Sequence, residues 1–172
     1  TVTNTSGTAI IVNNDDSATS AVSISNNNLG TSGGFGMQLR QDGNGTQTTL
    51  IDNNTIGATA FGSLILNARD GNGTLNATVT NNTNLVAPTS GFAPGLAVTS
   101  EDSNTLNVSI TGNNFTGANS FPGTEDIALT ENSASALNVT QTSAANLSAL
   151  NNSDTVGVTG APQFGQSAPP QP

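Results

Sequence analysis

The amino-acid sequence predicts an all-β domain, a β-solenoid of about 5–6 coils of 27–31 residues whose strands run parallel to one another. Three observations predict this fold. The sequence repeats at that period, each copy alternates apolar and polar residues as a half-buried strand does, and clusters of Gly, Asn and Asp fall between the strands as turns. A single unit of this length cannot bury its own apolar side, whereas a stack of such units can.

The first strand of each unit is the clearest element of the repeat. Its copies align on four aliphatic residues, which are Ile24, Ile51, Val79 and Ile110. A weaker fifth copy follows at Gln141, after the same interval as the one between Val79 and Ile110. Residues 74–79 and 105–110 carry aliphatic side chains at every second position. This alternation predicts a strand with one buried face in each unit.

An Asn residue follows this strand at the same position of four successive units: Asn27, Asn54, Asn82 and Asn113. Asn tolerates the left-handed backbone of a tight corner, and its amide can donate to the equivalent carbonyl one unit away. The sequence therefore predicts a structural Asn ladder along one corner of the solenoid. In a chain with 25 Asn residues, the alternative is a chance alignment.

A second short strand is predicted after this corner. It is marked by apolar residues two positions apart: Ile10/Val12, Met37/Leu39, Leu64/Leu66, Leu96/Val98, Ile127/Leu129 and Val156/Val158. Together with the first strands, these pairs would fill a narrow interior of Val, Ile, Leu, Met and Ala side chains. No segment has the pattern of an amphipathic helix.

The predicted domains are a solenoid over residues 1–160 and a Pro-rich tail over residues 161–172. Four of the seven prolines lie in the tail, so we expect a linker or an extended strap that forms no strand ladder. At the start of the chain no cap is evident, and the fifth copy loses its corner Asn. Open strand edges invite pairing, so we expect self-association through the solenoid ends, with head-to-tail stacking into a fibre as one form.

The composition excludes several classes of function. The chain has no Cys, His or Lys, which excludes a thiol nucleophile, disulfides, a zinc site, a Ser-His-Asp triad and Schiff-base chemistry. The net charge is −9 and the two cations are Arg40 and Arg69, so no nucleic-acid partner is expected. The longest aliphatic run, residues 9–12, is too short for membrane insertion. The absence of a signal peptide, an initiator Met and Cys suggests a processed, extracellular chain.

The pattern Val-x-Ile-x-Asn-Asn at residues 22–27, a Gly-rich corner, a second apolar pair and then Asp-Gly-Asn-Gly-Thr at residues 42–46 resembles the repeats of right-handed, single-stranded parallel β-helix proteins. The resemblance covers about residues 8–147. Such repeats occur in pectate-lyase-like folds, in bacterial surface adhesins and in autotransporter passengers. The resemblance implies a right-handed coil, and it implies either an enzyme or an inert stalk, because this fold carries both.

Seven of the eleven acidic residues fall near one corner of successive units: Asp15, Asp16, Asp42, Asp70, Glu101, Asp102 and Glu131. Carboxylates stacked at coil spacing repel one another unless they are screened or bridged, and Ca²⁺ takes six to eight oxygen ligands. The candidate calcium ligands are Asp42, Asp70, Glu101 and Asp102. The alternative is a solvated edge on which Arg40 and Arg69 offset the repulsion. No other cofactor is expected.

Each full unit carries one Phe in the connection between the Asn corner and the second strand: Phe35, Phe61, Phe92 and Phe121. Aromatic rings on neighbouring loops would form a strip that binds sugar rings or a protein partner. The alternative is that the rings cover the apolar pairs beneath them. If the solenoid has a binding face, we expect it at these loops.

Two other functions receive less support. Asp15, Asp16 and Asp52 are carboxylates of the kind that polygalacturonase-like enzymes use in pairs, but no His or Lys accompanies them, so we expect no enzymatic activity. A column of Thr19, Thr46, Thr74 and Thr105 would suit ice binding, but the next outward column is mixed. Strand propensity accounts for these Thr residues.

The sequence thus predicts a non-catalytic, secreted or cell-surface β-solenoid with a structural or adhesive role, as a stalk, a passenger segment or a fibre subunit of an extracellular matrix. Its partners would be further copies of the chain, or a carbohydrate or surface partner at its loops. The alternative is a carbohydrate-active β-helix domain that binds or cleaves polysaccharide.

Overall fold

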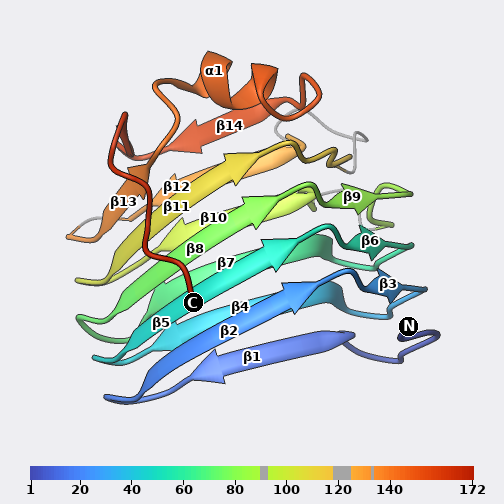
Figure 1. Ribbon diagram of the computed structural model, residues 1–172, viewed down its shortest axis with the longest axis horizontal. Helices are drawn as coiled ribbons and strands as arrows, with labels where there is room; N and C mark the ends of the chain where they lie inside the picture. Colours follow the sequence, from blue (N-terminus) through green and yellow to red (C-terminus); the bar gives the residue numbers. More distant parts are fainter. Residues whose placement is uncertain (90–92, 118–124, 133) are drawn as a thin grey trace.

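The chain winds into a parallel β-solenoid of about five turns with almost no helix (Figure 1). A computed structural model describes residues 1–89, 93–117, 125–132 and 134–172. Three sheets run along the solenoid, and every strand pair in them is parallel. The predicted fold class is therefore confirmed.

The two long sheets contain six strands each. The first has the order β1 (Ile10–Asn14), β4 (Phe35–Asp42), β7 (Gly62–Arg69), β10 (Leu96–Ser100), β12 (Ile127–Glu131) and β14 (Val156–Thr159). The second has the order β15 (Gln163–Phe164), β13 (Ala136–Val139), β11 (Thr105–Thr111), β8 (Thr74–Thr80), β5 (Thr46–Asp52) and β2 (Thr19–Ser25). A short third sheet consists of β3 (Asn28–Leu29), β6 (Thr55–Ile56) and β9 (Thr83–Asn84).

The coil is right-handed. In Figure 1 the strands of the second sheet cross the front of the molecule, those of the first sheet return behind them, and the chain climbs from the N-terminus to the C-terminus. Crossovers between parallel strands of one sheet almost always have this hand, because right-twisted strands pack back onto the sheet only in that sense.

The strand register matches the repeat read from the sequence. The aligned aliphatic residues stack in one column: Ile24 on Ile51, Ile51 on Val79, and Val79 on Ile110. The apolar pairs of the second predicted strand stack in the same way through the first sheet, from β1 to β14. Successive coils therefore place equivalent residues above one another, as predicted.

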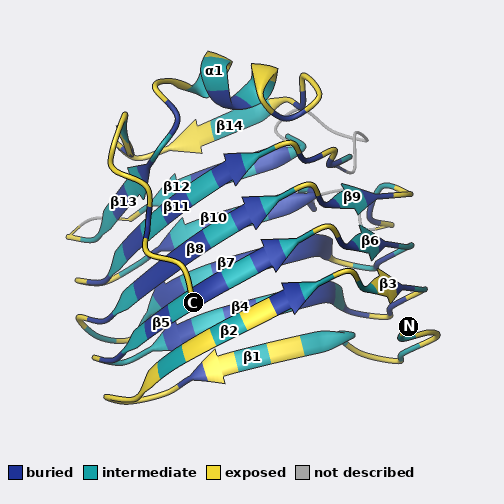
Figure 2. Cartoon of the chain, in the orientation of Figure 1, coloured by how far each residue is buried: buried dark blue, intermediate teal, exposed yellow. Residues whose placement is uncertain are grey.

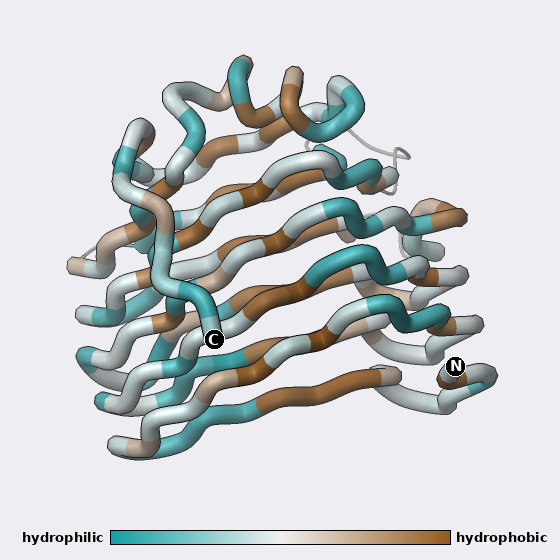
Figure 3. Tube along the Cα trace, in the orientation of Figure 1, coloured by the Kyte–Doolittle hydropathy of each residue, from teal (hydrophilic) through white to brown (hydrophobic). Residues whose placement is uncertain are grey.

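The interior is apolar in the middle and C-terminal coils. Leu75, Leu106 and Leu137 form one fully buried inward column of the second sheet. Figure 2 shows that burial is greatest in the middle coils and lower along β1, β2 and β14, and Figure 3 shows apolar residues recurring along the strands. At the N-terminal end the same column changes character, because Gln47 stacks on Leu75.

The interior of the first coils is more polar than the sequence predicted. Gln47 and Thr49 are fully buried, and neither side chain has a hydrogen-bond partner among the described residues. The buried Asn14 donates through Nδ2 to Oε1 of Gln41 at 2.6 Å. The expected stack of aliphatic side chains is thus wrong for these coils, where inward polar residues replace it.

The residue before the ladder Asn adopts the left-handed backbone conformation in each corner. The angle φ is 59° at Asn26, 52° at Asn53 and 56° at Asn81, and Gly112 takes this place in the next coil with φ 70°. Asn and Gly are the residues that adopt this conformation at least cost. The sequence assigned two roles to one Asn, the left-handed corner and the hydrogen bond to the next coil. In the structure, the residue before the ladder Asn has the first role and the ladder Asn has the second.

The ladder Asn residues join each coil to both of its neighbours. The backbone N and Nδ2 of Asn27 donate to Oδ1 of Asn54 at 3.0 and 3.1 Å, and Asn54 binds Asn82 in the same way at 3.0 and 2.8 Å. Nδ2 of Asn54 also donates to the Ile24 carbonyl, in the preceding coil, at 2.8 Å. Asn82 and Asn113 continue the series at 2.9 and 3.0 Å.

The ladder extends one coil further than the sequence predicted. The backbone N and Nδ2 of Asn113 donate to Oδ1 of Asn151 at 3.0 and 2.8 Å, across a spacing of 38 residues. The additional residues form α1 (Ala144–Ala149), whose N-cap is Ser143. Leu147 of α1 is fully buried against the end of the core. A helical cap therefore stands where the sequence indicated a fading repeat and no helix.

The tail begins as part of the second sheet. Gln163 and Phe164 pair in parallel with Asn138 and Val139 of β13, and Phe164 packs against the core. The expectation that the tail forms no strand ladder is wrong for these two residues. No helix among the described residues is long and apolar enough to span a membrane.

Replacing Asn82 with Ala is expected to lower the free energy of unfolding by about 2–4 kcal/mol, because Asn54 loses the acceptor of two hydrogen bonds and the Ile51 carbonyl loses a donor. Urea titration followed by circular dichroism measures the change. The matched control is Asn67→Ala, on the outward side of β7, with an expected change within about 0.5 kcal/mol. Equal losses in the two variants would contradict a stabilising ladder.

Candidate functional site

The acidic residues predicted to cluster lie at the corner where the first sheet turns into the second. Asp42 ends β4 and Glu131 ends β12, while Asp70 follows β7 and Glu101 and Asp102 follow β10. The angle φ is 59° at both Asp70 and Asp102, so these acids occupy left-handed turn positions. Short polar side chains tolerate this conformation, which is a local reason for Asp at these points.

Asp42 and Asp70 do not share a register position. Asp42 pairs with Arg69, one residue earlier than the alignment of the two Asp-Gly-Asn-Gly-Thr segments predicts. Partners in β4 and β7 are closer together in the sequence, by one position, than partners in β5 and β8, so the extra residue falls within the turn. The acidic column therefore contains a guanidinium group.

Arginine side chains hold this part of the corner. Nε of Arg69 lies 3.1 Å from Oδ1 of Asp42 and 3.3 Å from Oδ2 of Asp70, and Nη2 of Arg40 lies 2.5 Å from Oδ2 of Asp42. Oδ2 of Asp102 accepts a hydrogen bond from the backbone N of Asp70 at 2.7 Å. In the described part of the chain, no three carboxylates converge as metal ligands would. The geometry favours an ion-paired corner over a calcium-binding one.

Two of the four Phe residues lie side by side. The ring centroids of Phe35 and Phe61 are 6.0 Å apart with an interplanar angle of 57°, and Phe61 is 53% exposed. Phe92 and Phe121 lie outside the described residues. The described pair therefore offers one accessible ring at the predicted binding face.

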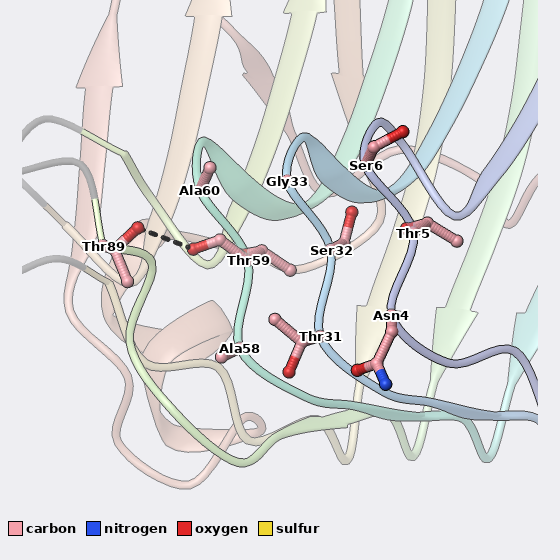
Figure 4. A pocket seen from close by; sticks show the side chains of 10 residues that line it. All are labelled: Asn4, Thr5, Ser6, Thr31, Ser32, Gly33, Ala58, Thr59, Ala60 and Thr89. Atoms are coloured by element: carbon pink, nitrogen blue, oxygen red, sulfur yellow. Dashed lines mark hydrogen bonds between the residues drawn. The ribbon is translucent and has the colours of Figure 1, made fainter.

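A shallow groove of about 430 Å³ lies in the same connections (Figure 4). Its central residues come from successive coils and stack on one another, because Thr5 bridges Ser32 and Ser32 bridges Thr59 in parallel. The backbone N of Thr89 donates to the Thr59 carbonyl at 2.9 Å and adds a fourth layer. We call this set of four residues the hydroxyl column.

The hydroxyl column is largely occupied with its own backbone. Oγ of Ser32 lies 2.6 Å from the Gly7 carbonyl and 2.7 Å from the Phe35 carbonyl, and Oγ1 of Thr5 donates to Gly7 at 2.9 Å. Oγ1 of Thr59 is buried, with no partner among the described residues. The groove is therefore shallow and lined mainly by small residues, and few of its polar groups are free to bind a ligand.

Sequence reasoning predicted a binding face at these connections but missed the hydroxyl column. Thr5, Ser32 and Thr59 recur at equal intervals, and Thr89 follows after a slightly longer one. This spacing is the one signal that marks the column. Ser and Thr number 18 and 26, or 44 of 172 residues, so a periodic hydroxyl is not distinctive in this chain.

The described acid with a perturbed pKa lies at the C-terminal end of the solenoid, away from the acidic corner. Asp154 is 5% exposed, and its Oδ2 accepts a hydrogen bond from the backbone N of Phe115 at 2.7 Å. Burial raises the pKa of Asp154 to about 6; the bond from Phe115 opposes this rise, and the charge of Asp126 adds to it. Asp126 is in turn bound by the backbone N and Oγ1 of Thr155, both at 2.8 Å.

Comparison with known proteins finds no relative, because no family model, no curated protein and no solved structure matches this chain. The fold and the geometry of these sites are therefore the basis for assigning a function.

An ion-paired corner predicts that the melting temperature is the same with a calcium chelator and with added CaCl₂. Arg69 and Arg40 neutralise Asp42 without a metal, and these ion pairs, which are partly open to solvent, contribute only about 1 kcal/mol. Differential scanning calorimetry at fixed ionic strength measures both conditions, with MgCl₂ as the control for charge screening. A rise in melting temperature with Ca²⁺ alone would restore the calcium hypothesis.

Asp154→Asn is expected to stabilise the protein more at pH 7 than at pH 4. The pKa of Asp154 is higher in the folded chain than its ordinary value of 3.8, so the folded state binds more protons between about pH 4 and pH 6. Stability from this group therefore falls as the pH rises through that window, and Asn removes the loss, which is on the order of 1–3 kcal/mol. Thermal unfolding of both proteins from pH 4 to pH 7 measures the difference. The control is the exposed Asp15→Asn, and a pH-independent effect of Asp154→Asn would refute the assignment.

Proposed function

We propose that the chain is a non-catalytic structural module of an extracellular or cell-surface protein, in which the solenoid acts as a stiff stalk or spacer. The observation that carries the proposal is the continuous hydrogen bonding along the axis. Three sheets and the Asn ladder from Asn27 to Asn151 join successive coils. These hydrogen bonds all span the same gap between two coils. Separating the coils therefore requires breaking the ladder and the strand pairing together.

The chemistry of the side chains supports a non-catalytic role. The chain has no His, Cys or Lys, and its two Arg residues are engaged with Asp42. General acid–base catalysis needs two groups placed around a substrate, with pKa values matched to their tasks. The described acid with a raised pKa, Asp154, is buried beneath the C-terminal cap rather than at the groove.

The proposed location at a cell surface rests on the resemblance of the repeat to surface adhesins and autotransporter passengers, and on the composition. Self-association through the ends remains part of the proposal, with one restriction from the fold. Helix α1 covers the C-terminal end of the core, so head-to-tail stacking through that end would require this helix to move.

A second candidate function is carbohydrate binding at the groove. Phe61 follows the lining residue Ala60 directly and is 53% exposed, which suits stacking against a sugar ring. The groove beside it is lined mainly by small residues stacked at coil spacing, so an extended ligand would lie along it better than a compact one.

The experiment that separates the two candidates exposes the purified chain to neutral and acidic polysaccharides. Binding is measured on a glycan array, and cleavage by the appearance of new reducing ends. The structural role predicts neither turnover nor saturable binding. Product release above that of heat-denatured protein would overturn the non-catalytic proposal.

Saturable binding without turnover would favour the carbohydrate-binding candidate, and paired variants locate it. Phe61→Ala is then expected to weaken binding at least tenfold, because the stacking ring is lost. Leu85→Ala, at a more exposed apolar residue outside the groove, is the control and is expected to have no effect. Equal effects of the two variants would exclude the groove as the site.

A further inference from the structure

The last residues of the tail, 167–172, lie across the outward face of the second sheet (Figure 1). They form no strand of their own. After β15, the backbone N of Gly165 donates to the Gln141 carbonyl at 2.8 Å and that of Gln166 to the Val139 carbonyl at 3.1 Å. From there the segment of residues 167–172 descends across β13 and β11 toward β8 (Figure 1). The segment runs across the strands instead of alongside them. It therefore contacts the sheet as a bound peptide would, and it does not extend the sheet as another strand.

The far end of this segment is held by specific contacts. Nε2 of Gln171 donates to Oγ1 of Thr78 on β8, 93 residues earlier in the chain. Pro169 is buried, although its neighbours Ala168 and Pro170 are exposed. Pro169 therefore packs against the face, and the Gln171 amide fixes the position of the segment.

The face beneath the segment is polar, and its side chains bond one another. Nδ2 of Asn138 donates to Oδ1 of Asn107, and Nδ2 of Asn107 donates to Oδ1 of Asn76, both at 2.8 Å. This outward series is separate from the corner ladder. Asn76 points outward yet is only 7% exposed, whereas the equivalent outward Thr48 of β5, also an interior strand of the sheet, is half-buried. The difference is consistent with cover by the tail.

We propose that the outward face of β8, β11 and β13 is a binding site for extended proline-rich peptide segments, and that residues 167–172 occupy this site in cis. Proline has few conformations to lose on binding and no N–H to leave unpaired, so a proline-rich segment suits a face whose polar groups already bond one another. The same segment of a second copy is the occupant in trans. The attached tail has an effective concentration in the millimolar range and competes with it.

The test uses a synthetic peptide of residues 167–172 and two isotope-labelled proteins, the full chain and a chain that ends at Gln166. The shorter chain keeps β15 and every strand pair. On titration, the peptide is expected to give saturable NMR shifts at the side-chain amides of Asn76 and Asn107 and at the backbone amide of Thr78 in the shorter chain. The full chain is expected to bind the peptide at least tenfold more weakly.

A control peptide with Gln171→Ala and Pro169→Gly is expected to bind at least tenfold more weakly than the native peptide. No saturable shifts in the folded shorter chain, equal binding by both chains, or sharp unrestrained signals from residues 167–172 of the full chain would each overturn the proposal.

A second protein variant covers the case in which circular dichroism shows that the shorter chain is unfolded. The full chain with Pro169→Gly and Gln171→Ala keeps its length and all of its strands, and it removes only the two contacts of the segment. It is expected to expose the Asn76 side-chain amide to solvent exchange and to bind the native peptide. Failure on both counts would equally overturn the proposal.

Discussion

The stacking of each coil directly upon the last is the constraint on which the rest of the structure depends. Parallel pairing sets equivalent backbones one strand spacing apart. Whether a side chain stabilises the fold therefore depends mainly on the residues directly above and below it. Ile stacks on Ile and Val, and a ladder Asn stacks on another Asn whose oxygen accepts two of its bonds. Gly45 shows the same constraint sterically, since a Cβ there would collide with the Ala18 carbonyl oxygen of the preceding coil.

This constraint explains why most of the fold could be predicted from the sequence. Alternation along residues 74–79 and its recurrence at 105–110 predict both the strands and their register, because a shift by one residue would expose the whole buried set. The Asp42 register was predicted wrongly because the extra residue lies in a turn, where alternation gives no guide. Asn151 was missed because α1 lengthens the spacing to 38 residues.

The candidate sites were less predictable than the fold. Arg69 has a clear chemical identity, but its contact with Asp42 depends on the position of one inserted residue. The hydroxyl column is periodic, yet Ser and Thr are too frequent in this chain for their periodicity to stand out. Contacts between segments distant in the sequence, such as Gln171 with Thr78, leave no local pattern at all. The acidic corner, the groove and the outward face of β8, β11 and β13 thus differ in chemistry, although all three lie on the same repeated coils.

The buried Gln47 amide, unpaired within the described residues, makes the two ends of the rod unequal in strength. A buried amide without a partner costs about 1–3 kcal/mol, which is more than a typical hydrogen bond contributes, and the buried Thr49 hydroxyl adds to this penalty. Repeat arrays lose order unit by unit from their weakest neighbour interface. Loss of order is therefore expected to begin in the coils of β2 and β5, beside the buried Gln47, and to reach the Leu-lined coils of β8, β11 and β13 last.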